Sequence, residues 1–293
     1  DAKQYLELLA TDHPGLRAGD KNIFPSKTIT VDIDADAIRA KGIIPKGMEN
    51  LLVNQMQIKV LNDVIEKRDL VFLDLLLTTN WERPIYLNPT SLSQMNLDLR
   101  PYVIQEGNVY RILPIKNNRP DRDYLVNTEK SYDLLINTFK YRGLNDSSIY
   151  YTNDYTMQVW NHRSNFNSLA EALIDKGETD KASKVLSFSL SRMSDAAVPY
   201  DPSSPDTVNL LFKVGQKQKA IEVAKVVANR AKEISSFLID DGNTSSFQLR
   251  QNIYLLRAMQ RCLYENGEEE LAMNYEEEYT DLIDRLENKE HSR

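Results

Sequence analysis

The sequence is poor in the residues that build most catalytic and metal-binding sites. Among 293 residues there is one cysteine, which excludes an intrachain disulfide and therefore a disulfide-stapled scaffold. This absence does not decide between a cytoplasmic and a periplasmic protein. Cys262 lies on a helical pattern with Met259 and Leu263, which favours a buried structural thiol.

Histidines and acidic residues give no recognisable metal pattern. The chain has three scattered histidines: His13, His162 and His291. Asp32-x-Asp34-x-Asp36 resembles the start of a calcium loop, but the sixth position is Ala37 rather than Gly and the twelfth is Ile43 rather than Glu. We interpret the triplet as a strand edge followed by a helix cap at Asp34 or Asp36. Since Gly-rich phosphate loops, Gly-x-Ser-x-Gly turns and Cys/His pairs are also missing, we predict no metal and no cofactor.

Charge and hydropathy exclude two further classes. The 36 basic and 43 acidic residues give a net charge of −7, so we predict no nucleic-acid partner. The longest apolar run, Leu70 to Leu77, contains Asp74 and is far shorter than the ~20 residues of a membrane span. Hydrophobic residues make up 41% and charged residues 27%, which is typical of a folded chain, here long enough for two domains or one large one.

Residues 1–125 carry strand and helix patterns in alternation. Period-two alternation predicts strands at 28–33 and 55–60, and residues 84–88 read as a third strand. Helical spacing predicts a helix over 63–79, capped at Asn62 or Asp63. Residues 102–105 and 109–115 read as a hairpin across Glu106-Gly107-Asn108. We therefore predict a small α+β domain over residues 1–125.

Residues 126–293 carry helical patterns throughout. Gly-x-x-x-x-Ala occurs three times between amphipathic stretches, beginning at Gly177, Gly215 and Gly267. Each glycine is expected to end a helix in the left-handed conformation, and each alanine to permit a close helix crossing. We predict a helix over 128–141, a second from His162, and an all-α array of hairpins. The array is tetratricopeptide-like but irregular, and its concave face is the natural place for a partner segment.

Four aromatic residues cluster in the first part of the second predicted domain: Tyr150, Tyr151, Tyr155 and Trp160. They suit packing at the domain junction, where a ring is buried and its polar tip stays satisfied. They also suit stacking on a sugar or a peptide. We keep both interpretations and treat the four residues as a candidate binding or interface site.

The string Asn80-Trp81-Glu82-Arg83-Pro84-Ile85-Tyr86 is the most distinctive in the chain. Pro84 disfavours a helical conformation at Arg83, so a helix must end before it and a strand can follow. One interpretation is a corner pinned by a buried Trp81, with Arg83 paired to a carboxylate. The other is that Trp81 and Arg83 face a ligand or another part of a larger protein.

This string resembles the extramembrane C-terminal region of a large family of membrane proteins, abundant in Bacteroidetes, whose membrane half looks like a protein O-mannosyltransferase. Further segments agree with the resemblance in the expected order: Phe24-Pro25-Ser26-Lys27, Glu106-Gly107-x-x-Tyr110-Arg111-Ile112-Leu113-Pro114, Phe139-Lys140-Tyr141-Arg142-Gly143, Asn165-Phe166 through Gly177, and Val198-Pro199-Tyr200-Asp201. The similarity therefore extends over most of the chain.

The resemblance implies a multispanning glycosyltransferase with a GT-C-type membrane core, a lipid-linked sugar donor and protein acceptors outside the cytoplasm. The core expected to carry the catalytic residues is missing from this sequence, so no catalytic residue is assigned. Because the chain begins Asp-Ala-Lys-Gln, without an initiator Met, we expect it to be a piece of a larger protein.

From the resemblance we expect an appendage at the periplasmic face of the inner membrane. Its expected partners are the membrane domain of the same parent protein and an acceptor protein or peptide. The favoured hypothesis is a non-catalytic binding or scaffolding region. The alternative is an independent soluble enzyme acting on glycans, with its site at the domain junction.

Overall fold

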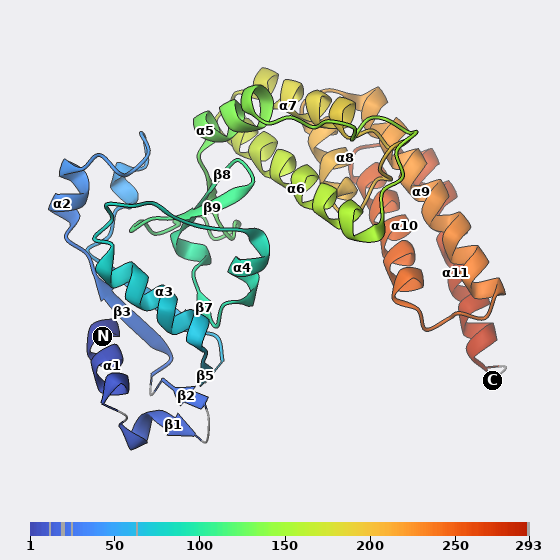
Figure 1. The fold of residues 1–293 in the computed structure, drawn as a ribbon. Helices are drawn as coiled ribbons and strands as arrows, with labels where there is room; N and C mark the ends of the chain where they lie inside the picture. Colours follow the sequence, from blue (N-terminus) through green and yellow to red (C-terminus); the bar gives the residue numbers. More distant parts are fainter. Residues whose placement is uncertain (12, 19–20, 25, 63, 292–293) are drawn as a thin grey trace. The chain divides into compact units, whose positions relative to one another are not determined.

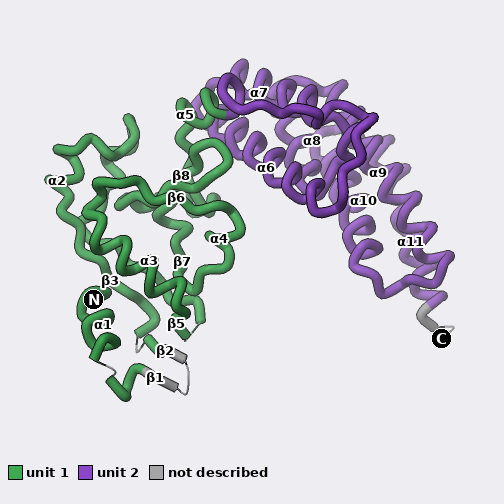
Figure 2. Tube along the Cα trace, in the orientation of Figure 1, with its two compact units in different colours: residues 1–134 green, residues 135–293 purple. Residues whose placement is uncertain are grey.

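The computed structural model describes residues 1–11, 13–18, 21–24, 26–62 and 64–291. Pro25 of the Phe24 motif and Asp63, one of the two predicted caps, lie outside the described residues. The chain divides into two compact units, Asp1–Leu134 and Leu135–Arg293 (Figure 2). The predicted domains, residues 1–125 and 126–293, stay a prediction.

The first unit mixes short strands with helices, as predicted (Figure 1). Its elements are α1 (Ala2–Ala10), η1 (Pro14–Leu16), β1 (Arg17–Ala18), β2 (Lys21–Ile23), β3 (Thr28–Asp32), α2 (Ala35–Ala40), η2 (Glu49–Leu51), β4 (Gln55–Val60), β5 (Val64–Ile65), α3 (Lys67–Thr78), β6 (Ile85–Leu87), α4 (Pro89–Gln94), β7 (Leu97–Asp98), η3 (Arg100–Tyr102), β8 (Val103–Glu106), β9 (Val109–Ile112), β10 (Leu125–Val126) and α5 (Thr128–Tyr132).

Three small sheets organise this unit. Strands β3, β4 and β7 form an antiparallel sheet in which Ile29 pairs with Ile58 and Val31 with Met56, so the predicted alternation is confirmed. The second sheet has the order β10-β8-β9-β6, and its β8–β9 hairpin turns at Gly107 as predicted. Strand β10 pairs with β8 in parallel, which the sequence pattern did not indicate. The third sheet joins β1, β2 and β5.

Helices α1 and α3 cover the core that the first sheet supports. Helix α1 packs against both β3 and α3 (Figure 1). The buried face of α3 contributes Phe72, Leu73 and Leu76. Tyr102 is fully buried, and its hydroxyl accepts from Gln57 N at 2.7 Å and donates to Gln57 O at 3.1 Å. These two bonds satisfy the polar tip of a large, fully buried side chain.

The predicted start of α3 was wrong. Val64 and Ile65 form strand β5 against β2, so the helix begins only at Lys67. Glu66 and Asp69 form a reciprocal capping box, in which Glu66 N donates to Asp69 Oδ2 at 2.9 Å. Asp69 is fully buried and also accepts from Asn96 N at 3.0 Å. The cap therefore serves the core as well as the helix.

At α2 the predicted cap is confirmed, since Asp34 accepts from Ala37 N at 2.9 Å.

The corner after α3 has an unusual backbone. Asn80 and Trp81 both have positive φ, 48° and 60°, a region that few non-glycine residues occupy. Lys41 Nζ donates to Asn80 O at 2.8 Å and so ties the corner to α2. Trp81 packs against the core as a partly buried side chain.

The second unit is all-helical, as predicted. Its elements are η4 (Asp133–Thr138), which begins in the first unit, α6 (Asn153–Asp175), α7 (Thr179–Arg192), α8 (Ser204–Lys213), α9 (Lys217–Asp240), α10 (Phe247–Glu265) and α11 (Glu269–His291). All residues from 162 to 286 are described, and none is in a strand, which confirms the switch from strand to helix patterns.

Two predicted helix limits in this region were wrong. The predicted helix 128–141 is α5 followed by the π-helical η4, which ends at Thr138 because Tyr141 turns inward. The Tyr141 hydroxyl donates to Leu135 O at 2.9 Å, and its ring packs against Phe166 and Phe188. Helix α6 begins at Asn153, nine residues before His162. The sequence did not indicate these first turns, because they are exposed and lack an apolar stripe.

The three predicted hairpin turns are confirmed in detail. Gly177 has a φ of 77°, its N–H donates to Ile174 O at 2.9 Å, and Glu178 N donates to Leu173 O at 2.9 Å. This is the Schellman arrangement, and it recurs at Gly215 and Gly267. Gly242, which ends α9, adopts the same arrangement and was not predicted.

The hairpins stack so that alternate helices are neighbours. Helix α8 packs against both α6 and α10, and α9 packs against α11 (Figure 1). The alanines of the three motifs, Ala182, Ala220 and Ala272, are fully buried. Small side chains at these positions allow adjacent helices to approach closely, as predicted.

Candidate functional site

Helix α10 exposes an aromatic and basic face. Phe247, Arg250, Tyr254 and Arg261 follow each other at helical spacing and lie on one side; we call these four residues the α10 stripe. Phe247 is 72% exposed and Tyr254 is 61% exposed. The opposite side of α10 is buried and carries Leu249, Leu256, Met259 and Leu263. Large exposed aromatics on one helix face mark a candidate interaction surface.

The fold holds this face in place from both ends. The side chain of Ser246 caps α10 by accepting from Leu249 N at 3.1 Å. At the other end the Gly267 turn joins α10 to α11. The aromatic face is therefore presented on a regular helix rather than on a loop.

A groove runs beside the stripe, between α8 and α10. Its volume is about 260 Å³, and it is lined by Asn209, Tyr254, Arg257, Ala258, Arg261, Cys262 and Glu265. Cys262 is buried beside it, with its Sγ 3.7 Å from Pro205 O. Burial raises the pKa of the Cys262 thiol to about 11, although a hydrogen bond with Asn209 acts in the opposite direction. The thiol is therefore mostly protonated at physiological pH, which makes it poorly reactive.

The charges along the stripe are only weakly compensated. Arg250 is exposed and forms no ion pair with any residue that the structure describes. Arg261 has Glu265 as its carboxylate neighbour at 3.7 Å, and both side chains are exposed. Arg257, by contrast, is paired with Glu276 and lies over the ring of Tyr279. Arg250 and Arg261 therefore keep their positive charge available to a ligand.

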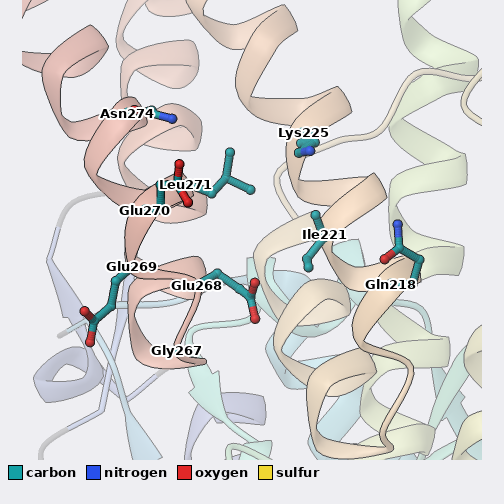
Figure 3. A pocket seen from close by; sticks show the side chains of 9 residues that line it. All are labelled: Gln218, Ile221, Lys225, Gly267, Glu268, Glu269, Glu270, Leu271 and Asn274. Carbon is teal, nitrogen blue, oxygen red and sulfur yellow. The ribbon is translucent and has the colours of Figure 1, made fainter.

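A second, larger opening lies between α9 and α11 (Figure 3). It measures about 730 Å³ and is lined by Gln218, Ile221, Lys225, Gly267, Glu268, Glu269, Glu270, Leu271 and Asn274. Figure 3 shows Leu271 and Glu268 pointing toward α9, whereas Glu269 points away from it. Glu268 is already paired with Lys217 at 2.5 Å. The opening is wide and polar, and it is a weaker candidate than the α10 stripe.

The predicted aromatic cluster spans a loop and the start of α6. Tyr150 is 87% exposed and Tyr155 is 65% exposed, whereas Tyr151 and Trp160 are partly buried. Tyr155 and Trp160 are five residues apart on α6, so their side chains project about 140° apart around the helix. The four rings therefore do not share one helix face. Their role in binding or at the domain junction stays a prediction.

Trp81 and Arg83 differ in their surroundings. Trp81 packs against the core of the first unit, as described above. Arg83 is exposed and has no ion pair within the described part of the chain, so the expected carboxylate partner was wrong. A role of either residue at an interface stays a prediction.

A buried arginine on α6 was not predicted from the sequence. Arg163 donates to Asp201 Oδ2 at 2.6 Å and to the carbonyls of Pro199 (2.8 Å), Val198 (2.6 Å) and Met193 (3.0 Å). Its guanidinium also lies over the ring of Tyr200. These contacts fix the segment between α7 and α8, which contains the Val198-Pro199-Tyr200-Asp201 motif. The motif is thus part of the fold of the array.

A second missed network lies in the first unit around Glu106, which is 1% exposed. Its Oε2 accepts from Tyr86 Oη at 2.7 Å and Lys130 Nζ at 2.6 Å, and its Oε1 accepts from Asn127 Nδ2 at 3.1 Å. Burial raises the pKa of Glu106, but the hydrogen bonds outweigh it and set the pKa below the ordinary value. The motif that begins at Glu106 therefore joins β8, β6 and α5.

Two properties of the described residues bear on function. Within the described ranges, His, Cys, Asp and Glu side chains form no group of three or more that could hold a metal ion. No helix in that part of the chain has both the length and the apolarity needed to cross a bilayer.

One comparison with known families matches within the first unit, which holds the three small sheets. Residues 1–130 match the family model described as TMEM260-associated domain 2, which fits a TMEM260-like family. The match covers the α+β region and ends before the helical array. No curated protein and no solved structure matches the chain.

Proposed function

We propose that this chain is a non-catalytic binding and scaffolding region of a membrane glycosyltransferase related to protein O-mannosyltransferases. The α10 stripe is the observation that carries the proposal. Tyr, Phe and Arg are enriched at protein interfaces, and they contribute most of the binding energy where they cluster. The stripe lies on the side of α10 opposite its buried residues, so its side chains are open to a partner.

The architecture supports the same proposal. Stacked helical hairpins present extended surfaces on which a partner segment can lie. The match to TMEM260-associated domain 2 supports an association of the α+β unit with a TMEM260-like protein. We place the region at the periplasmic face of the inner membrane, where it contacts the membrane domain of its parent, an acceptor protein or another partner.

Site-specific photo-crosslinking tests this function. A photoreactive residue replaces Tyr254 on the stripe or, as the matched control, Met273 on α11, which is 63% exposed. Both variants are made in the parent protein and irradiated in its own membranes. We expect discrete protein adducts from position 254 and few from position 273. Equal labelling, or none from either position, would contradict the proposal.

The alternative function is an independent soluble enzyme acting on glycans. We expect the purified chain neither to transfer nor to hydrolyse sugars. Turnover of an activated or lipid-linked sugar by the chain, abolished by a single carboxylate substitution, would establish the enzyme instead.

A further inference from the structure

We propose that the α10 stripe and the α8/α10 groove bind an acidic peptide segment that carries one large apolar side chain. The inference rests on the proposed binding function and names the chemistry of the partner. Phe247 and Tyr254 are exposed, although nothing in the described part of the fold requires it. A bound partner would remove part of their apolar surface from water, which favours binding.

Charge complementarity favours an acidic partner. The chain as a whole carries −7, yet on the stripe Arg250 has no ion pair among the described residues and Arg261 has only an exposed partner, Glu265, at 3.7 Å. Glu265 lies at the C-terminal end of α10, fifteen residues after Arg250. Arginine binds carboxylates in a bidentate manner, so two acidic side chains of the partner can each engage one guanidinium.

The groove supplies an apolar position between the two arginines. Ala258 and Tyr254 line it, and the small alanine side chain leaves the space open above the buried Cys262. One large apolar side chain from the partner can enter there, beside the tyrosine ring. Burial of such a side chain contributes affinity that charge pairing at an exposed rim does not.

Helix geometry sets the spacing of the partner's residues. Arg250 and Arg261 are eleven residues apart, which is about 16 Å along the helix axis at the usual rise per residue. Successive side chains of an extended peptide point to opposite faces at about 3.3 Å per residue, so residues that face α10 are an even number of positions apart, and spacings of four and six positions bracket that distance. Ala258 lies about 12 Å from Arg250 along the helix axis, so the apolar residue follows the first acidic residue by four positions.

A peptide is favoured over two other polyanions. The net charge of −7 repels a nucleic acid or an anionic bilayer over their full length, whereas a short peptide meets only the local positive charge. The groove is also a recess between two helices, which a flat bilayer surface does not enter.

Fluorescence anisotropy with synthetic peptides tests the proposal on the whole chain. The probe is a labelled peptide with two glutamates six positions apart and a phenylalanine four positions after the first, so that all three side chains lie on one face of the extended peptide. Its controls replace the glutamates with lysine, or the phenylalanine with serine. We expect the acidic peptide to bind and both control peptides to bind at least about tenfold more weakly. Added salt should weaken the binding of the acidic peptide.

Charge-reversed proteins locate the site. Arg250→Glu and Arg261→Glu should each weaken binding severalfold, whereas Arg39→Glu, an exposed arginine of the first unit, should leave it unchanged. Melting curves verify that each variant is folded. Equal binding of acidic and basic peptides, or no effect of either reversal, would overturn the proposal, as would a preference of the stripe for single-stranded DNA or phosphatidylglycerol vesicles. If crosslinking at position 254 succeeds while every acidic peptide fails, the binding function stands and the partner chemistry is wrong.

Discussion

Replacing Arg163 with methionine should destabilise the helical array more than any surface substitution. The Arg163 side chain is 5% exposed and satisfies Asp201 together with three main-chain carbonyls. Methionine keeps much of the length and volume but offers no donor. It therefore leaves the carbonyls of Met193, Val198 and Pro199 buried without this partner.

The magnitude follows from two opposing effects. Hydrogen bonds to a charged group contribute about 1.5–3 kcal/mol each, and simple addition over four bonds would overestimate the loss. Burying the guanidinium itself costs free energy, which methionine recovers, and Asp201 keeps its bonds from Ser203 N and Oγ. We expect a net loss of about 3–5 kcal/mol, the usual result of removing one partner of a buried ion pair.

Thermal melting followed by far-ultraviolet circular dichroism measures this loss. For a unit of this size the expected decrease in Tm is about 6–20 °C. Arg163→Lys keeps the charge but cannot reach all four acceptors, so its Tm should fall between those of the parent and Arg163→Met. Arg83→Ala serves as the control, since an exposed unpaired side chain should change stability by less than about 0.5 kcal/mol. If Arg163→Met melts within about 2 °C of the parent, the buried arginine does not hold the segment between α7 and α8.

Three further predictions concern single residues in both units. Cys262 should react slowly with iodoacetamide at pH 8 in the folded chain and rapidly in urea, because burial raises its pKa to about 11; equal rates would show that the α8/α10 seam is open. The pKa of Glu106 is lower in the folded chain than its unfolded value of about 4.3. The free energy of folding that Glu106 contributes is therefore fully present above about pH 4.3, and it is lost as the pH falls through the folded pKa. The urea concentration at which the first unit is half unfolded should therefore decrease as the pH is lowered below about 4. Glu106→Gln should lower this midpoint at neutral pH and flatten its dependence on pH; parallel pH profiles of variant and parent would exclude the network as the cause. Trp81→Ala should cost about 1–3 kcal/mol, less than a fully buried tryptophan, and parent-like melting of the variant would assign the residue to an interface.

Glycine chemistry made the helical array predictable. At Gly177, Gly215 and Gly267 a positive φ is required by the local turn, so the sequence motif and the structure coincide. Gly242 was missed because no alanine follows it at the same spacing. The β8–β9 hairpin was predictable for a similar local reason, since the turn contains Gly107.

Features that depend on distant residues were not predictable. In the sequence, Arg163 looks like a solvent-facing residue of an amphipathic helix. Its buried role was not predictable, because its acceptors are main-chain carbonyls about thirty residues away along the chain. The true cap of α3, Glu66, depends on Val64 and Ile65 pairing with β2. The α10 stripe was not predicted, because helical spacing indicates the buried face of a helix but does not show what the other face can bind.

The repeated hairpin turn also has a consequence for how the array folds. Each Schellman turn closes through hydrogen bonds between residues five apart or fewer, and α6–α7, α8–α9 and α10–α11 each pack as sequential pairs. Contacts between sequence neighbours carry little loop-closure entropy, and proteins rich in them fold quickly. Each hairpin can therefore form as soon as its own two helices have been synthesised, before the rest of the array has emerged.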